Sequence, residues 1–262
     1  MPINLFTIKI PSYIQKSMYH SIKKALRILI PKKILFKIEP TLRYFFSLPF
    51  RGKKHFCPVC NIYLKKFITL KNNDLLCPNC GSLARDRRLF LLLKNNFLSE
   101  EIKVLDFSPS RCLSRKLKKT KLIDYISTDL SGNFNADFNY DITNIDLSSN
   151  TIDLIICYHV LEHIEDDLMA MKELHRILKP SGKAVLQTPF KKGAIYENST
   201  VKSPKERIEH FGQDDHVRIY SVDGLKERLE ITDFNVEVYN YTEKEIYQGL
   251  KENETILIIS KK

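Results

Sequence analysis

The sequence predicts an α/β protein in which a mostly parallel, doubly wound β-sheet follows two smaller N-terminal units. Two observations lead to this prediction. Apolar strand-like runs alternate with helical stretches through the second half of the chain, and two close pairs of cysteines precede them. A chain of 262 residues has room for one full α/β domain and one small unit. We expect a basic helical arm at 1–52, a cysteine-bearing unit at 53–82 and the α/β domain at 83–262.

The N-terminal arm carries the net charge of the chain. The formal charge is +11, and residues 1–56 account for all of it because Glu39 is their single acid. Residues 12–30 show helical periodicity with one apolar and one basic face, and two shorter apolar-basic pieces, KILFKI and LRYFFSLPF, follow. Two interpretations stay open. Residues 12–50 bind an anionic partner, either a membrane surface or RNA, or their apolar face packs on the protein's own core.

The composition excludes several classes of protein. Hydrophobic residues make up 43% of the chain and charged residues 28%, which is typical of a globular protein and excludes wholesale disorder. The first residues lack a signal-peptide pattern, and no run approaches the roughly 18 consecutive apolar residues of a membrane-spanning helix. We therefore expect a cytoplasmic protein with reduced thiols, with peripheral binding at the inner face of the membrane as a further expectation for the arm.

The cysteine-bearing unit contains two C-x-x-C pairs, Cys57-Pro-Val-Cys60 and Cys77-Pro-Asn-Cys80. Each tight turn points two sulfurs to the same side, and two such turns complete a tetrahedral thiolate site that suits Zn²⁺. This spacing resembles a zinc ribbon, and the intervening residues read as a hairpin with its tip at 72–74. Because all four thiolates are used, we expect a structural zinc ion; a redox-active cysteine pair is the alternative.

The α/β domain begins after a linking helix at 82–98 and alternates strands with helices. A last helix and two strands close the domain, and the segment 190–220 reads as loop-rich and is expected to cover the substrate. A further short strand is expected to end at Tyr140-Asp141-Ile142. The other expected strands are 103–107, 122–128, 153–158, 183–189, 234–241 and 254–260, and the helices are 111–119, 166–178 and 221–230.

Polar side chains follow several of these strands where each strand ends, which is where parallel α/β sheets bind ligands. Asp129 follows the second strand and is placed to accept hydrogen bonds from a ribose diol. Asp141 follows the short third strand, where it is placed to accept a hydrogen bond from an adenine amino group. The full set of candidate ligand-binding residues is Asp106, Phe107, Ser108, Ser110, Asp129, Leu130, Asp141, Ile142 and Tyr158.

The order and spacing of these elements resemble the class I S-adenosylmethionine-dependent methyltransferases, in particular the small-molecule group, over residues 100–262. The most specific parts are the stretches 153–164 (DLIICYHVLEHI) and 174–182 (LHRILKPSG), and the second is similar to the family's L-x-x-x-L-K-P-G-G run. The ribbon, the run 80–88 and the run 211–218 look like a subgroup of these enzymes. The resemblance implies a Rossmann-like sheet of seven strands with the last strand antiparallel, and S-adenosylmethionine as the cofactor.

The first loop of the sheet departs from the family pattern. The family reads D-x-G-x-G there, whereas this chain reads Asp106-Phe-Ser-Pro-Ser110. A Cβ at each glycine position narrows the cleft and disfavours a positive φ, although a serine hydroxyl can donate to the methionine carboxylate of the cofactor. A non-catalytic zinc-ribbon protein on a degenerate cofactor fold therefore stays open beside the enzyme.

The run His159-Val-Leu-Glu162-His163 also matches H-x-x-E-H, the zinc signature of inverted zincins. That signature needs both histidines in the middle of a helix, whereas here they follow a buried strand directly. We therefore do not favour a metalloprotease.

Methyl transfer needs a base only when the acceptor must lose a proton. We expect His163 and His216 to be the catalytic candidates, with His210 as a further candidate, and Asp214 and Asp215 to orient His216 or to raise its pKa. A small molecule or a saccharide of surface-glycan biosynthesis is the favoured acceptor. An RNA methyltransferase that uses the ribbon and the basic arm is the alternative.

Overall fold

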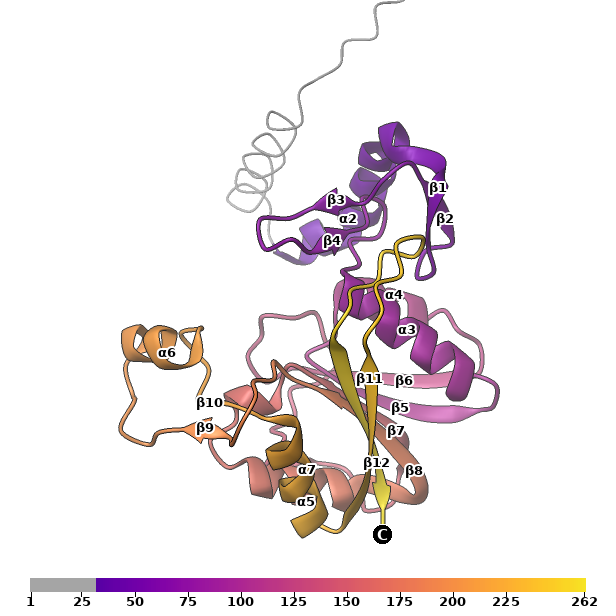
Figure 1. The fold of residues 1–262 in the computed structure, drawn as a ribbon. Coiled ribbons are helices and arrows are strands. Elements are labelled where there is room, and N and C mark those ends of the chain that lie inside the picture. The colour runs from indigo at the N-terminus through magenta and orange to yellow at the C-terminus, as the bar shows by residue number, and fades with distance from the viewer. Residues whose placement is uncertain (1–31) are drawn as a thin grey trace, which may run out of the picture.

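The computed structural model describes residues 32–262, so the expected helix at 12–30 lies outside the described residues. A six-stranded sheet in the order β11-β12-β8-β7-β5-β6 forms the centre of the molecule (Figure 1). Neighbouring strands are parallel except where β12 pairs antiparallel with β8 and β11, so the predicted antiparallel last strand is confirmed. The strands are β5 (Ile102–Phe107), β6 (Ile123–Thr128), β7 (Ile152–Tyr158), β8 (Leu178–Gln187), β11 (Phe234–Tyr241) and β12 (Glu254–Lys261).

The Rossmann-like class is confirmed, but the expectation of seven strands is wrong by one. The stretch expected to form the third strand makes only isolated bridges, between Thr128 and Phe138 and between Asp141 and Asn144. The side chain of Asp137 occupies the free edge of β6, because its Oδ2 accepts hydrogen bonds from both the hydroxyl and the backbone N–H of Ser127. The Asp137 side chain thus takes a backbone hydrogen bond of Ser127 that a neighbouring strand would otherwise make.

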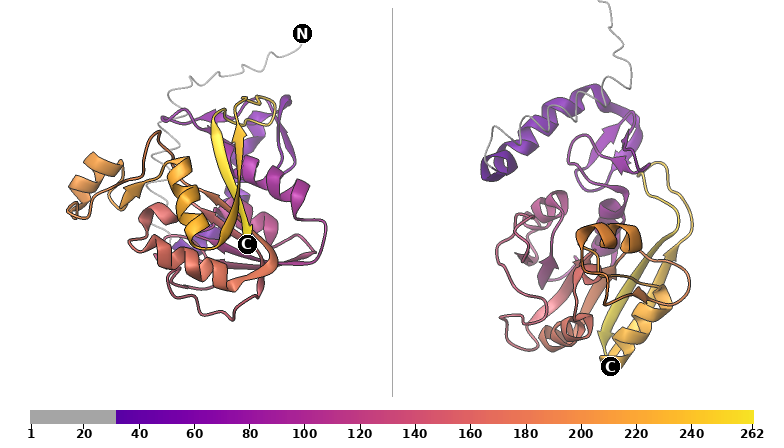
Figure 2. Two further views of the ribbon diagram at one scale, coloured as in Figure 1. Left: turned by 60° about the horizontal axis from the view of Figure 1, so that its bottom comes forward. Right: turned by 90° about the vertical axis from the view of Figure 1, so that its left-hand side faces the viewer.

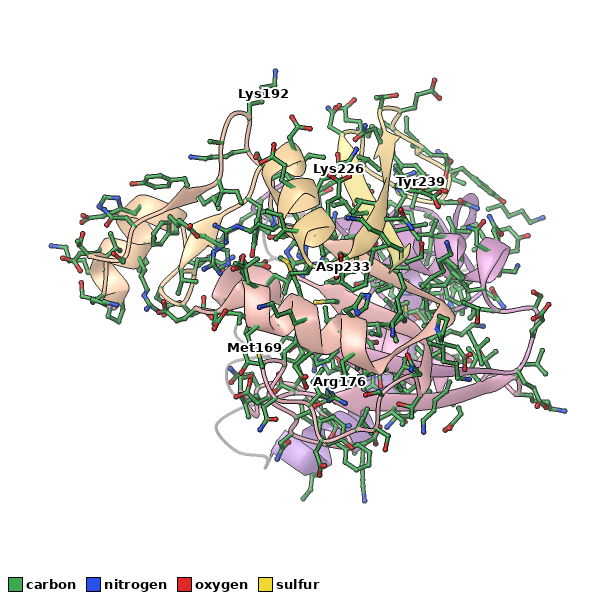
Figure 3. The ribbon with its side chains drawn as sticks, turned by 90° about the horizontal axis from the view of Figure 1, so that it is seen from below. Met169, Arg176, Lys192, Lys226, Asp233 and Tyr239 are labelled. Atoms are coloured by element: carbon green, nitrogen blue, oxygen red, sulfur yellow. The ribbon has the colours of Figure 1, made fainter. Side chains whose placement is uncertain are left out.

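The helices cover both faces of the sheet, as the alternating order predicts. On one face lie α5 (Asp167–Ile177) and α7 (Val222–Ile231), which run side by side in Figure 3, with Met169 and Arg176 labelled on α5 and Lys226 on α7. On the other face lie α3 (Ala84–Asn96) and α4 (Arg111–Leu117). Successive strand residues alternate between the two faces, so each face has its own buried apolar cluster.

The cysteine-bearing unit shares the apolar cluster of the α3–α4 face. Its Cys57, Leu64 and Phe67 belong to the same cluster as Val104 of β5 and Leu154 of β7. Two small antiparallel sheets build the unit, and the second forms the hairpin predicted between the cysteine pairs. The strands are β1 (Arg51–Cys57), β2 (Ile62–Leu64), β3 (Ile68–Thr69) and β4 (Leu75–Leu76). The unit is therefore fused to the sheet through a common core.

The loop between β11 and β12 reaches up to the cysteine-bearing unit (Figure 1). The backbone N–H of Phe56 donates to the carbonyl of Tyr247 across 2.8 Å. Arg87 on α3 is fully buried and donates from its guanidinium to the carbonyls of Gln248 and Gly249 and to that of Leu75 in β4. One side chain thus joins the helix, the cysteine-bearing unit and the C-terminal hairpin.

Residues 32–47 form one helix, α2 (Lys32–Ser47), rather than two short pieces, and the short helix η1 (Leu48–Phe50) follows. Figure 2 shows α2 extending from the cysteine-bearing unit above the body of the molecule. Glu39 of α2 forms salt bridges with Arg111 and Arg115 of α4, at 3.1 and 2.8 Å. Phe50 is buried in the shared cluster. Glu39 and Phe50 therefore attach this part of the arm to the body, whereas Ile34, Leu42 and Phe45 of α2 are exposed, and the partner of the arm stays a prediction.

The segment 190–220 contains more structure than the sequence led us to expect. Helix α6 (Pro204–Phe211) and the small sheet of β9 (Tyr196–Glu197) and β10 (Arg218–Ile219) project from the body (Figure 1). Ser203 and Glu206 form a reciprocal capping box that starts α6, with Pro204 at its first position. The capping residues Ser203 and Glu206 and the first-turn Pro204 could therefore have been recognised in the sequence.

None of the helices within residues 32–262 is long and apolar enough to cross a membrane.

Candidate functional site

The loop after β5 keeps the backbone conformation that a glycine would supply. Ser108 has a φ of 49°, in the left-handed region that non-glycine residues rarely adopt. Its N–H donates to the carbonyl of Thr128 at the end of the neighbouring strand β6, across 2.8 Å. Ser110 then stands at the N-cap of α4, with its hydroxyl 3.5 Å from the sulfur of Cys112. The serine therefore adopts the left-handed conformation that a glycine would adopt easily.

Asp129 lies buried at the end of β6, where the sequence places a ribose-binding acid. Its Oδ1 accepts from the hydroxyl of Ser108 across 2.9 Å. The hydroxyl of Ser131 lies 3.1 and 2.9 Å from its two oxygens, and the N–H of Phe134 donates to Oδ2 across 3.1 Å. The carboxylate is thus held by three donors of this chain. The two hydroxyl donors can rotate away when a ribose diol approaches.

Asp106 is the second buried acid of this edge. Burial raises the pKa of Asp106 to about 7, although the hydrogen bond from the hydroxyl of Tyr125, at 2.7 Å, acts in the opposite direction. The negative charge of Asp86 raises it further. Near neutral pH this carboxyl group therefore exists in both protonation states.

The other expected ligand-binding residues have different environments. The side chains of Phe107 and Ile142 lie in the apolar core, so only their backbone is available to a ligand. Leu130 is exposed. Asp141 is exposed and its Oδ1 accepts from the N–H and the hydroxyl of Thr143. Tyr158 packs on the α3–α4 side, and its buried hydroxyl has no hydrogen-bond partner among residues 32–262. Their roles stay predictions.

A second group of polar side chains gathers after β7, which lies next to β5 in the sheet. A carboxylate oxygen of Glu162, a ring nitrogen of His163 and a ring nitrogen of His216 all lie within 4.8 Å of one another. Oδ2 of Asp215 lies 3.3 Å from Nδ1 of His163. We call these four residues the histidine–carboxylate cluster. Because β5 and β7 are parallel neighbours, the cluster and the loop at 108–110 lie at the same edge of the sheet.

Hydrogen bonds join residues 216–218 to the turn after β7 and place the His216 ring next to that of His163. The N–H of Val217 donates to the carbonyl of Glu162 across 2.9 Å. The buried Arg218 donates to the carbonyls of Leu161, Ile164 and Glu165. The rings of the two histidines then meet edge to face, with centroids 4.7 Å apart.

The structure corrects two expectations about the histidines. Burial lowers the pKa of His216, and the neighbouring His163 lowers it further, so the expected rise is wrong. The carboxylate of Asp215 faces His163 instead of orienting His216. His210 is not part of the cluster, because it lies on α6 with its Nδ1 against the hydroxyl of Tyr196.

Glu162 is the most buried member of the cluster, with 1% of its surface exposed. Burial acts to raise its pKa, but the hydrogen bond from His159 acts in the opposite direction, and the pKa of Glu162 lies below its usual value. The turn itself is tight, because His159 has a φ of 55°. The sequence marked Glu162 only as part of a motif that we set aside, so its place in the cluster was missed.

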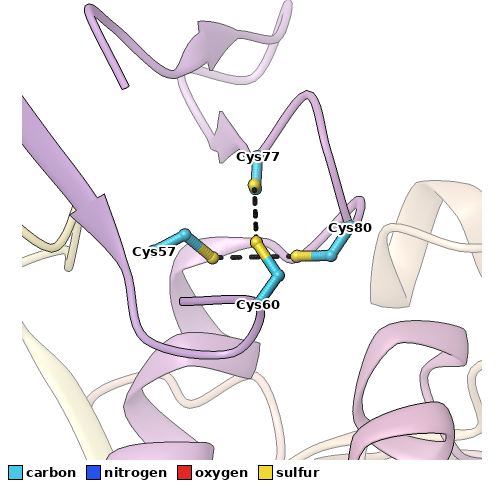
Figure 4. Close-up of side chains that lie close together, drawn as sticks. All are labelled: Cys57, Cys60, Cys77 and Cys80. Atoms are coloured by element: carbon cyan, nitrogen blue, oxygen red, sulfur yellow. Dashed lines mark hydrogen bonds between the residues drawn. The ribbon is translucent and has the colours of Figure 1, made fainter. Parts of the chain in front are cut away.

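The four cysteines of the pairs come together in one group (Figure 4). The sulfurs of Cys57 and Cys80 are 3.7 Å apart, and those of Cys60 and Cys77 are 3.8 Å apart. Zn–S bonds of about 2.3 Å in a tetrahedron place sulfurs about 3.8 Å apart, whereas a disulfide needs only about 2.05 Å. The cluster is therefore compatible with zinc and excludes disulfides between these pairs.

Ser82 and Arg87 lie where they would stabilise the negative charge of four thiolates around a metal ion. The hydroxyl of the buried Ser82 lies 3.4 Å from the sulfur of Cys57 and 3.2 Å from that of Cys80. Arg87 in turn donates to the hydroxyl and the carbonyl of Ser82. Four thiolates around a divalent ion carry two net negative charges, which a buried guanidinium offsets. The remaining thiols, Cys112 and Cys157, are separate from this group, and burial raises the pKa of both.

Comparison with known proteins identifies the family. Residues 81–238, more than half of the chain, match the family model described as "Methyltransferase domain". The chain belongs to this methyltransferase family, and its fold is Rossmann-like. A sequence search of curated proteins finds no match.

Solved structures are similar to this chain at low sequence identity. The [4+2]-cyclase SpnF has a TM-score of 0.52 and 14% identity, covering 87% of this chain and 94% of that chain. A SAM-dependent methyltransferase from Archaeoglobus fulgidus has a TM-score of 0.49 and 18% identity, over 70% and 95%. Phosphoethanolamine N-methyltransferase 2 of Haemonchus contortus, in complex with S-adenosyl-L-methionine, has a TM-score of 0.48 and 15% identity, over 67% and 52%.

The residues at the β5–β6 edge fit S-adenosylmethionine. The left-handed Ser108 gives the loop its turn, and Asp129 is a buried carboxylate whose serine donors can yield to a ribose diol. When bound, the cofactor supplies a methyl group on a positively charged sulfur that leaves readily. Ser108 and Asp129 would hold that cofactor, and most of the catalysis would then come from positioning it against the acceptor.

Proposed function

We propose that this methyltransferase acts on a hydroxyl oxygen of a small-molecule or saccharide acceptor, which binds against the histidine–carboxylate cluster. The observation that carries the proposal is the cluster itself, at the same sheet edge as the cofactor loop. A hydroxyl group must lose its proton on methylation, and the cluster offers groups that favour this loss. The lowered pKa of His216 keeps its imidazole neutral near pH 7, and the lowered pKa of Glu162 keeps its carboxylate charged.

An RNA acceptor is the second candidate, and the basic arm is the feature that favours it. Outside the arm, however, the charges balance, and the cysteine-bearing unit uses one face to pack on α3 and the sheet. The same arm would also keep the enzyme near a membrane-borne acceptor, which is consistent with a small or saccharide substrate. We further propose that the four-cysteine group holds a structural zinc ion.

The test is to incubate the full chain with S-adenosylmethionine carrying a labelled methyl group, together with a small-molecule cell extract or with total RNA. We expect the label in a small product, as a methyl ether that resists mild base, and clearly less label with the Asp129→Ala variant at a limiting cofactor concentration. Label in RNA would favour the second candidate. Label bound to nitrogen or carbon of a small product would overturn the choice of oxygen.

A further inference from the structure

We propose that the histidine–carboxylate cluster is a second metal site, which binds one divalent cation of the Mn²⁺ to Zn²⁺ series through Glu162, His163 and His216. The site is separate from the four-cysteine group. Two imidazoles and a carboxylate form a mixed N/O ligand set that these ions accept with open positions left for substrate. Ion–ligand bonds of about 2.1 Å place ligand atoms about 3.0–3.4 Å apart, so atoms within 4.8 Å of one another need only a small closure.

The orphaned oxygen of Glu162 is the strongest evidence for a cation. Oε2 is buried and has no hydrogen-bond partner among residues 32–262, on a side chain that is 1% exposed. A charged carboxylate without water or partner at one oxygen is costly in the interior of a protein. A cation at Oε2 would remove this cost. No donor among residues 32–262 forms a hydrogen bond with Oε2, so this position is open to an ion.

His159 explains why Oε1 is satisfied and Oε2 is not. Nη1 of Arg85 lies 3.3 Å from Nε2 of His159, and a guanidinium can only donate, so Nε2 is the acceptor. In a neutral ring, Nδ1 then carries the proton and donates to Oε1 of Glu162 across 3.2 Å. The carboxylate is thus oriented from one side by a protein donor. Outer partners of this kind orient metal ligands in known sites.

Asp215 plays the corresponding part for His163. Its Oδ2 lies 3.3 Å from Nδ1 of His163, which favours the tautomer with the proton on Nδ1. The lone pair of Nε2 then stays available for an ion, as in carboxylate–histidine–metal arrangements. Asp215 is 64% exposed in its side chain, so it provides a positioning group that can be changed without disturbing the core.

The role of the ion deepens the proposed function and rests on it, whereas ion binding itself does not. An acceptor with two neighbouring oxygens, such as a saccharide diol, would occupy the open positions. The cation lowers the pKa of the bound hydroxyl, whose proton passes to solvent. The oxygen then forms a bond to the methyl carbon while the carbon–sulfur bond breaks and its electron pair stays on sulfur. With the ion bound, His163 and His216 are its ligands, and the ion rather than the His216 imidazole favours the loss of the proton; without the ion, that role falls to His216.

The test uses Mn²⁺ as the probe, because thiolates prefer softer ions and the four-cysteine group will not compete for it. The full chain, purified with its cysteine site filled by Zn²⁺, is titrated with Mn²⁺ while the free-ion paramagnetic resonance signal is followed. We expect one Mn²⁺ per chain. Glu162→Gln should abolish this binding, and Asp215→Asn should weaken it by about 10–100-fold, in the range seen for outer partners of metal ligands. Glu165→Gln is the matched control, because this exposed acid on the same turn pairs with Arg207 and should bind Mn²⁺ as the unchanged protein does.

Thermal unfolding and S-adenosylmethionine titration without Mn²⁺ accompany every variant. Loss of Mn²⁺ binding in a Glu162→Gln variant that still folds and binds cofactor supports the site. Absence of Mn²⁺ binding to the unchanged protein, or equal binding by Glu162→Gln, overturns it. Failure of the cofactor titration with Mn²⁺ binding intact would instead count against the proposed function and leave the metal site standing.

Discussion

The hydroxyl group of Ser108 donates a hydrogen bond to Oδ1 of Asp129 across 2.9 Å, which links the unusual serine of the first loop to the acid that we expect to bind ribose. The serine adopts a positive φ, so the turn has survived the replacement of glycine. The difference lies at Asp129, whose carboxylate already accepts hydrogen bonds from the chain before the cofactor binds. Ribose hydroxyls must displace the hydroxyls of Ser108 and Ser131, and this exchange lowers the net gain on binding.

The first prediction follows from that exchange. Asp129→Ala should weaken S-adenosylmethionine binding by at least about 10-fold, since a hydrogen bond to a charged group contributes about 1.5–3 kcal/mol. Ser108→Gly should bind the cofactor at least as tightly as the unchanged protein, because glycine accepts the φ of 49° and removes a competing donor. Isothermal titration of both variants measures the effect. Ser131→Ala is the control for loss of a donor without a change of backbone, and unchanged affinity in Asp129→Ala would show that another acid binds ribose.

The second prediction concerns the four-cysteine group. Cys77→Ser should lose the metal and lower the melting temperature of the whole chain, because this unit shares its apolar cluster with α3 and the sheet. Elemental analysis of protein purified without added metal should find about one zinc per chain before the change and none after it. Cys112→Ser is the matched control, since that buried thiol is outside the group and should leave the zinc content unchanged. A metal-free protein with the same single, cooperative melt would contradict a structural zinc.

The third prediction uses the raised pKa of Asp106. The group titrates near its ordinary value of about 3.8 when unfolded and at about 7 when folded. Between these values the folded state binds more protons than the unfolded state, so stability falls as pH rises from about 4 to about 7. A pKa that differs by one between the folded and unfolded states corresponds to about 1.4 kcal/mol, so the shift of Asp106 makes the folded state about 4 kcal/mol less stable above pH 7 than below pH 4.

Asp106→Asn tests this dependence, because the amide keeps an oxygen for the hydroxyl of Tyr125 and carries no charge. We expect the variant to be more stable than the unchanged protein near pH 8 and about equal to it near pH 4. Denaturant unfolding at a series of pH values measures both curves. Parallel curves for the two proteins across this range would mean that Asp106 does not titrate as described.

Much of the fold could be predicted from the sequence because local patterns carry it. Apolar runs and the helices between them place β5, β6 and β7 within one residue at each end, and the two C-x-x-C pairs place the cysteine group. The strand expected at 183–189 begins five residues earlier, at Leu178. Apolar runs did not predict that the expected third strand is absent from the sheet. There the side chain of Asp137 takes hydrogen bonds at the edge of β6 that a neighbouring strand would have made. The Asp- and Asn-rich stretch before Tyr140 was a signal against a strand there, which our prediction did not take into account.

The histidine–carboxylate cluster shows how far the sequence alone could predict the candidate site. His163 and His216 are far apart in sequence and meet only because Val217 and Arg218 bond to the turn after β7. The pattern identified both histidines as candidates, but not their distance from each other or from Glu162. The same holds for the arm, where the sequence left an external partner and internal packing open, and it did not show that Glu39 pairs with α4.

The last prediction separates the two parts of the arm. A chain that starts at Lys32 should unfold at nearly the same temperature as the full chain and bind the cofactor equally well. A chain that starts at Arg51 should be clearly less stable, because it loses the salt bridges of Glu39 with α4 and the buried ring of Phe50. Removing a buried Phe side chain alone costs about 3–5 kcal/mol. Equal melting temperatures for these two truncated chains would show that α2 contributes nothing to the core.

The same pair of truncations tests the external partner. Residues 1–31 include five Lys and Arg and no acid, so their removal should weaken binding to vesicles that contain anionic lipid. Co-sedimentation at low and high salt measures this binding, which should fall as the Debye length shrinks from about 10 Å at 0.1 M to about 3 Å at 1 M. Vesicles of neutral lipid are the control. If the chain that starts at Lys32 binds anionic vesicles as well as the full chain does, the lipid contacts must come instead from the exposed Ile34, Leu42 and Phe45 of α2.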